Sequence, residues 1–150
     1  MTKTEIINEL LSYLSTDCVL YFSPEPEKLY KEQENKWGKA IEQFNQLGCD
    51  VQATTGLSVP PLTDKTKKVF SELLDGLDDE NLMWFRQLAG AYRSVILATL
   101  TFKKIYSVED AFDLSCLEEL FQNETWSHDE QADKVRQARK AIAIEASQHL

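Results

Sequence analysis

The chain has 150 residues, of which 43% are hydrophobic and 27% charged, a composition typical of one globular domain rather than of a disordered or membrane-embedded chain. Its formal net charge of -9 and isoelectric point near 4.7 disfavour nucleic acid and anionic membranes as partners, because both would repel it, and favour a basic or mixed-charge protein. No apolar run approaches the roughly 18 residues of a membrane span, and three widely spaced cysteines indicate neither a disulfide framework nor a zinc site.

The chain begins with two predicted helices. Thr2-x-x-Glu5 has the spacing of a capping box, in which each side chain satisfies a free backbone donor, and apolar residues at helical spacing follow until Thr16-Asp17 ends the helix. The proline-rich stretch 23–26 predicts a loop and the start of a long helix that runs to about Leu47. Gly48 is the expected C-terminal stop of that helix.

The middle of the chain contains the least helical stretch, 49–61. Its residues favour extended structure and Pro60-Pro61 is incompatible with a helix, so we expect an irregular or β-like segment there. Thr63 or Asp64 then caps a helix that is broken by Gly76 and the acids after it.

The most apolar predicted helix covers Glu80 to about Phe102. Gly90, Ser94 and Ala98 are spaced by four within it, and this stripe of small residues predicts a close approach by another helix.

Two further helices complete the prediction. Ser107-x-x-Asp110 resembles a capping box and predicts a helix to about Glu124, whereas Ser127-x-x-Glu130 matches the capping box fully and predicts a last helix toward His149. The sequence therefore predicts an all-α fold for residues 1–150, an orthogonal bundle of about six helices in a single domain, with the irregular stretch near 49–61.

An acidic segment at residues 105–133 has nine acidic side chains and no lysine or arginine, whereas the rest of the chain has 16 acids and 16 bases. Several of these acids fall in predicted first turns, where the helix dipole favours negative charge without any partner. The complete lack of bases is not explained in this way, so a partner-binding surface is the alternative interpretation. Phe121 and Trp126 lie within the segment, although either aromatic could equally be a core residue.

Catalytic and cofactor motifs are not found. The five glycines are scattered, the only histidines are His128 and His149, and no serine or cysteine has a recognisable nucleophile context. The pair Glu118-Glu119 points about 100° apart on a helix, which is unsuited to joint acid–base work. We therefore expect no enzyme activity, no cofactor and no metal, and elemental analysis would test the rival hypothesis of a helical metalloenzyme.

The pattern Leu117-Glu-Glu-Leu-Phe-Gln122-x-x-x-Trp126-Ser resembles the signature of the mitochondrial and bacterial chaperones that assemble F-type ATP synthase and act on its alpha subunit. Ser127 stands where that family has glycine, and serine is an equally good N-cap. The resemblance extends along the whole chain through four further pieces: Tyr13-x-x-Thr16-Asp17, Leu29-x-x-x-Gln33-x-x-x-Trp37, Thr55-Gly56-Leu57, and Ser94 with Leu97-Ala98.

The resemblance implies a molecular chaperone that binds the unassembled alpha subunit and prevents its aggregation, in the mitochondrial matrix of a eukaryote or the cytoplasm of a bacterium. It also implies that this monomeric chain corresponds to the helical C-terminal domain of the family, without the N-terminal β-rich domain. The alternative is an acidic helical adaptor that binds another basic protein. The partner-binding residues that we expect are Glu118, Glu119, Gln122, Trp126, Asp129 and Glu130, whereas Leu117 and Phe121 would anchor the segment to the core.

Overall fold

The computed structural model of the protein describes residues 1–125 and 129–150. Across these two ranges the chain forms eight α-helices and one short 3-10 helix, with no named strand. The helices are α1 (Lys3–Leu14), η1 (Cys18–Leu20), α2 (Glu27–Asn45), α3 (Asp64–Asp75), α4 (Asp79–Tyr92), α5 (Val95–Phe102), α6 (Val108–Ser115), α7 (Leu117–Thr125) and α8 (Glu130–Gln148). The all-α class predicted from the sequence is therefore confirmed.

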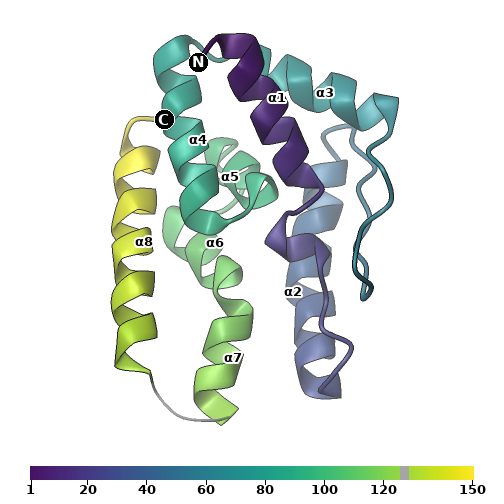
Figure 1. Ribbon diagram of the computed structural model, residues 1–150, viewed down its shortest axis with the longest axis vertical. Helices are drawn as coiled ribbons and strands as arrows, with labels where there is room; N and C mark the ends of the chain where they lie inside the picture. The colour runs from purple at the N-terminus through teal and green to yellow at the C-terminus, as the bar shows by residue number, and fades with distance from the viewer. Residues whose placement is uncertain (126–128) are drawn as a thin grey trace.

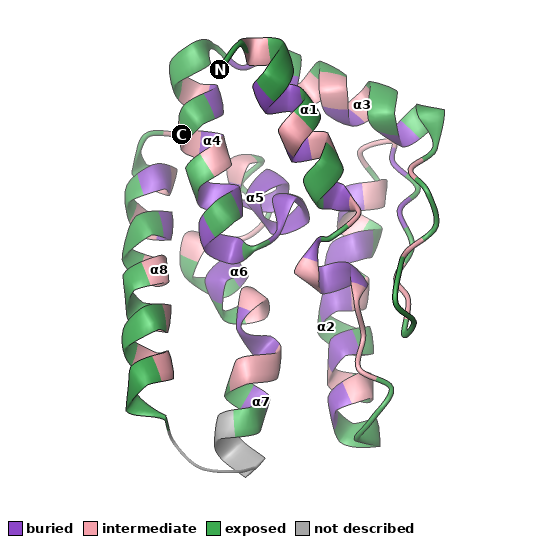
Figure 2. Cartoon of the chain, in the orientation of Figure 1, coloured by how far each residue is buried: buried purple, intermediate pink, exposed green. Residues whose placement is uncertain are grey.

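The helices surround α5, which lies at the centre of the molecule and contacts α1, α2, α4 and α6 (Figure 1). All residues from 95 to 101 are buried, so this short helix is covered on every side (Figure 2). The long helix α8 packs along α4, and α7 lies beside α2 at the opposite end of the molecule from α3. A helix that is apolar all round is stable in water only in such a central position.

Aromatic side chains connect the helices within the core. The Phe70 ring lies 5.9 Å from that of Phe44 and 6.5 Å from that of Phe85, measured between centroids, and Phe85 in turn contacts Phe102 at 6.3 Å. Phe44, Phe70 and Phe85 are fully buried. This row joins α2, α3, α4 and α5 through contacts that combine apolar burial with favourable ring geometry.

The predicted helix from residue 80 to residue 102 is wrong as a single element, because it divides into α4 and α5. Arg93 adopts the left-handed conformation with φ of 55°, and the Ser94 side chain then accepts a hydrogen bond from Leu97 N as the N-cap of α5. The small-residue stripe is corrected with it. Ser94 is a cap, and a Cβ on the exposed Gly90 would meet nothing within 4 Å, so no helix approaches there.

The predicted helix from residue 107 to residue 124 also divides, into α6 and α7. The two helices are separated at Cys116, the C-cap of α6, where Ser115 Oγ donates to the carbonyl oxygen of Phe112 at 2.6 Å. A serine hydroxyl that bonds to the preceding turn in this way is associated with a bend in the helix. The Ser107 cap itself is confirmed, since its side chain accepts from Asp110 N.

The irregular stretch predicted near 49–61 is confirmed. Gly48 precedes it with φ of +113°, a conformation that favours glycine and allows the chain to reverse after α2. The stretch has one isolated parallel bridge, between Tyr21 and Thr54. None of the helices in the described part of the chain is both long enough and apolar enough to cross a membrane.

Candidate functional site

The residues predicted to bind a partner lie at one end of the molecule, on α7 and at the start of α8. Glu118, Glu119 and Gln122 belong to α7, whereas Asp129 and Glu130 begin α8. Trp126 and Ser127 lie outside the described residues. The structure thus brings the acids of α7 and those at the start of α8 into one region, but it gives their side chains different surroundings.

Glu119 is the centre of a network of three arginines. Its Oε1 accepts from Arg139 Nη1 at 3.2 Å and lies 3.5 Å from Arg93 Nη1, while its Oε2 accepts from Arg136 Nη1 at 3.4 Å. Arg136 also pairs with Asp133, one turn earlier on α8. One carboxylate therefore joins α7 to α8 and to the residue that ends α4, and it is not the free surface acid that the sequence suggests.

Arg139 is the most enclosed member of this network, with 12% of its side chain exposed. Its Nε donates to the Ala91 carbonyl oxygen at 3.0 Å, and its guanidinium lies over the Phe112 ring, 5.4 Å from the centroid. These contacts fix α8 against α4 and α6. Because charged groups taken out of water need a partner, Glu119 has a structural reason to be acidic.

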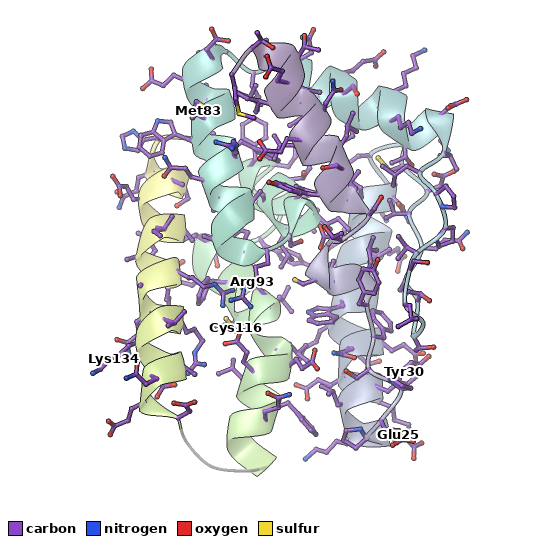
Figure 3. All side chains as sticks on the ribbon, in the orientation of Figure 1. Glu25, Tyr30, Met83, Arg93, Cys116 and Lys134 are labelled. Atoms are coloured by element: carbon purple, nitrogen blue, oxygen red, sulfur yellow. The ribbon has the colours of Figure 1, made fainter. Side chains whose placement is uncertain are left out.

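The sequence analysis did not single out Arg93, Arg136 or Arg139. Arg136 and Arg139 are three residues apart, which places them on one face of α8, and this spacing is the signal that could have found them. Arg93 gave no comparable signal, because its position depends on the break between α4 and α5. Figure 3 shows Arg93 reaching toward the α7–α8 pair.

The other signature acids also differ from one another. Glu118 is half-buried, and its Oε1 accepts from Ser23 Oγ at 3.2 Å. Asp129 is exposed and is the N-cap of α8, with Oδ1 accepting from Gln131 N at 3.0 Å and Ala132 N at 3.3 Å. The predicted Ser127-x-x-Glu130 box is therefore corrected: the helix begins at Glu130, one residue after an aspartate that supplies the cap itself.

Gln122 and Glu130 are exposed, and neither makes a side-chain hydrogen bond or ion pair to any described residue. Together with Asp129 they form what we call the α7–α8 tip. Among the predicted residues that the structure describes, these three side chains are the exposed ones.

The Tyr13-x-x-Thr16-Asp17 motif has a structural role at the N-terminal end of α5. Asp17 is 1% exposed, and its carboxylate accepts from Ile96 N at 2.9 Å and from Val19 N at 3.1 Å. It thus satisfies a free donor in the first turn of α5. Burial raises the pKa of Asp17 to about 6, although hydrogen bonds from Ile96 and its neighbours oppose the increase.

The Leu29-x-x-x-Gln33-x-x-x-Trp37 motif connects α2 to its neighbours. Gln33 Oε1 accepts from Ser23 N at 2.7 Å, and Trp37 Nε1 donates to the Leu114 carbonyl oxygen at 2.7 Å. Both side chains are buried. Among residues 1–125 and 129–150, no three histidine, cysteine or acidic side chains gather in a way that could hold a metal ion.

Known proteins resemble this chain in sequence and in fold. The family model described as ATP12 chaperone protein matches residues 1–45. The protein named atp12, mitochondrial, of Schizosaccharomyces pombe is 28% identical over 140 residues, which are 89% of this chain and 48% of that protein. The chain thus spans about half the length of this relative.

Two solved structures have the same fold. Atp12 from Paracoccus denitrificans superposes with a TM-score of 0.89 at 25% identity, covering 96% of this chain and 62% of that one. A point mutant of P. denitrificans Atp12p superposes with a TM-score of 0.91 at 24% identity, covering 97% of this chain and 62% of that one. These sources, one mitochondrial and one bacterial, agree with the two compartments expected from the sequence. The resemblance seen in the sequence is therefore confirmed: the chain is similar to the ATP12 chaperones in sequence and in fold.

Proposed function

We propose that the chain is a chaperone for assembly of the catalytic sector of F-type ATP synthase, and that it binds the unassembled alpha subunit and prevents its aggregation. The observation that supports this most is the likeness to Atp12, which covers 96% of the chain at a TM-score of 0.89. A binding role also suits the described residues, which present a charged helical surface and no cluster of metal-ligating side chains.

The proposal includes the organisation of the protein. The 150 residues act as one monomeric helical domain that corresponds to the C-terminal part of the longer relatives. The 62% coverage of the Paracoccus protein fits a chain that matches one part of a larger molecule.

The α7–α8 tip is the surface that we expect to contact the client. Gln122, Asp129 and Glu130 are exposed there, whereas Glu119 is already neutralised by three arginines. Exposed acids give electrostatic complementarity to a basic patch, which favours specificity and a fast association rate. Glu118 and Glu119 would then act by holding α7 in place, and Trp126 stays a predicted contact.

An aggregation assay tests the proposed function directly. Isolated alpha subunit is diluted from denaturant, and light scattering is followed with and without the 150-residue chain. Suppression at a near-stoichiometric ratio supports the proposal, provided that an unrelated acidic helical protein does not suppress scattering. Unchanged scattering, together with co-purification of a different basic protein from cells, would instead support an adaptor function.

The contribution of the tip is tested by substitutions that preserve the fold. Glu130→Gln and Gln122→Ala remove a charge and a polar group that have no partner within the described chain, so we expect weaker binding of the alpha subunit. Asp79→Asn is the matched control, because Asp79 is also the first residue of a helix whose N-cap is an aspartate. Equal affinity for all three variants would refute the role of the tip.

A further inference from the structure

A groove with a volume of about 560 Å³ lies between α2 and the arm formed by α6 and α7. Apolar side chains line its α6–α7 side, namely Leu114, Leu117, Leu120 and Phe121. Polar and charged side chains form its borders: Glu32, Asn35, Lys36 and Lys39 from α2, and Asp110 and Asp113 from α6. Leu120 is 37% exposed, so part of the apolar surface is open to solvent.

Two hydrogen bonds join α2 to the segments on the other side of the groove. Trp37 of α2 donates to the carbonyl oxygen of Leu114 at 2.7 Å, and Trp37 is 2% exposed. The Tyr106 hydroxyl donates to Gln43 Oε1, so the segment before α6 is also tied to α2. These partly buried hydrogen bonds between the two sides fix the distance between them, and a preformed groove lowers the entropic cost of binding.

Some of the charged side chains at the borders of the groove have an ion-pair partner, and others do not. Lys36 pairs with Glu32 at 2.9 Å. Lys39, Asp110 and Asp113 form no ion pair with any residue that the structure describes. The two aspartates are three residues apart and therefore project from the same face of α6.

The acidic segment thus divides into two parts. Toward α8, Glu119 and Asp133 are paired with arginines of this chain. Toward α2, Asp110 and Asp113 border the groove that Lys36 and Lys39 also line, but they form no ion pair with any residue that the structure describes. An occupant that places a basic side chain beside these aspartates would supply the missing charge.

We propose that this groove binds an amphipathic helical segment of the client, with its apolar edge against the exposed Leu120 and the half-buried Leu114 and a basic side chain toward Asp110 and Asp113. A groove that follows the length of two helices and combines an apolar lining with charged borders is typical of helix-in-groove recognition. The border on α2 extends from Glu32 to Lys39, about two turns, which matches the spacing of anchor residues on a bound helix. The inference rests on the proposed function, because it takes the alpha subunit as the source of the segment.

Affinity for the isolated alpha subunit, measured by biolayer interferometry, tests this inference. We expect the double variant Asp110→Asn/Asp113→Asn and the single variant Leu120→Ser each to bind about tenfold more weakly, as expected for loss of a central contact. Glu109→Gln is the matched control, because Glu109 is an exposed acid in the first turn of α6 that does not line the groove. Its affinity should equal that of the unsubstituted chain.

A cross-linking measurement gives an independent readout. A photoreactive benzophenone side chain at Asn35, which lines the groove, should cross-link to the alpha subunit, whereas the same group at the exposed Glu42 of α2 should not. If the chain binds the alpha subunit but the groove variants bind equally well and Asn35 does not cross-link, the groove inference is wrong and the proposed function stands. If the unsubstituted chain does not bind the alpha subunit at all, both are wrong.

Discussion

Charge reversal at Glu119 should destabilise the protein, because this residue holds the helices together. Glu119→Lys removes the carboxylate that faces Arg93, Arg136 and Arg139 and places a fourth positive charge among them. Removing one partner of a fully buried ion pair costs about 3–5 kcal/mol, whereas an exposed pair contributes about 0.2–1 kcal/mol. The side chains of Arg136 and Arg139 are 14% and 12% exposed and that of Glu119 is 34% exposed. We therefore expect a loss of stability between these two limits.

We expect Glu119→Lys to lower the free energy of unfolding by about 2–3 kcal/mol, which corresponds to a fall in Tm of roughly 5–10 °C for a domain of this size. Urea denaturation followed by circular dichroism at 222 nm measures the free energy, and thermal denaturation measures Tm. Glu119→Gln should cost about 1 kcal/mol, since the amide oxygen can still accept one hydrogen bond from an arginine.

Gln122→Lys is the control for this experiment, because Gln122 is exposed on the same helix one turn later and should change stability by less than about 0.5 kcal/mol. Equal losses for Glu119→Lys and Gln122→Lys would refute the structural role of Glu119. A double-mutant cycle of Glu119→Gln with Arg139→Met provides a second check, with an expected coupling of about 1 kcal/mol. A coupling near zero would mean that the two residues act independently.

Three further predictions concern the core. Asp17 should make stability fall as the pH rises from about 4 to about 6, because burial raises the pKa of Asp17 from 3.8 to about 6 in the folded state, so the fold retains a proton that the unfolded chain releases. Asp17→Asn should remove about 3 kcal/mol of this pH dependence in urea titrations, and superimposable pH profiles would contradict it. Phe70→Ala should cost about 3–5 kcal/mol by urea denaturation, against less than about 0.5 kcal/mol for the exposed Met83→Ala, and equal losses would exclude Phe70 from the core. The thiols of Cys18, Cys49 and Cys116 should react slowly with Ellman's reagent at pH 8 until urea is added, because burial raises the pKa of each and that of Cys49 to about 11; rapid labelling of the folded chain would disprove this.

Local sequence signals predicted the helix starts well because a capping interaction is made within one turn. The Thr2-x-x-Glu5 box is present in the structure, and Thr63 and Ser107 cap α3 and α6. The signal failed at Ser127-x-x-Glu130, where Asp129 caps α8. The capping-box spacing pointed to Ser127, and spacing alone did not show that the side chain of Asp129 would take the cap position.

The breaks inside apolar stretches were not predictable by the same reasoning. Residues 80–102 have continuous helical periodicity, yet Arg93 adopts a left-handed conformation and α5 starts a new direction. The break is stabilised by Asp17, which accepts from Ile96 N across 79 residues of sequence. A tertiary contact therefore overrides local propensity at this position, and no window of the sequence contains both partners.

The unbalanced charge of the acidic segment could be read from the sequence, but the electrostatic surroundings of its acids could not. Counting charges along residues 105–133 identified an unbalanced segment, whereas the bases that neutralise part of it come from Arg93, Arg136 and Arg139 outside that range. Helix pairing brings these residues together, and a linear count cannot anticipate it. The acids available to a partner are those that have no lysine or arginine beside them in the folded structure. Some acids with no basic neighbour along the sequence are paired in the fold and are therefore not available.

The motifs that suggested the family have a consequence for how its function should be tested. Asp17, Gln33 and Trp37 are buried, and each makes hydrogen bonds that join separate elements of this fold. Substituting them would unfold or loosen the protein, and the resulting loss of activity would not reveal a contact with a client. Information about the partner has to come from side chains that the fold itself does not need, such as the exposed Gln122 and Leu120. A variant at either position that retains stability but loses alpha-subunit binding would separate recognition from folding, which the motif residues cannot do.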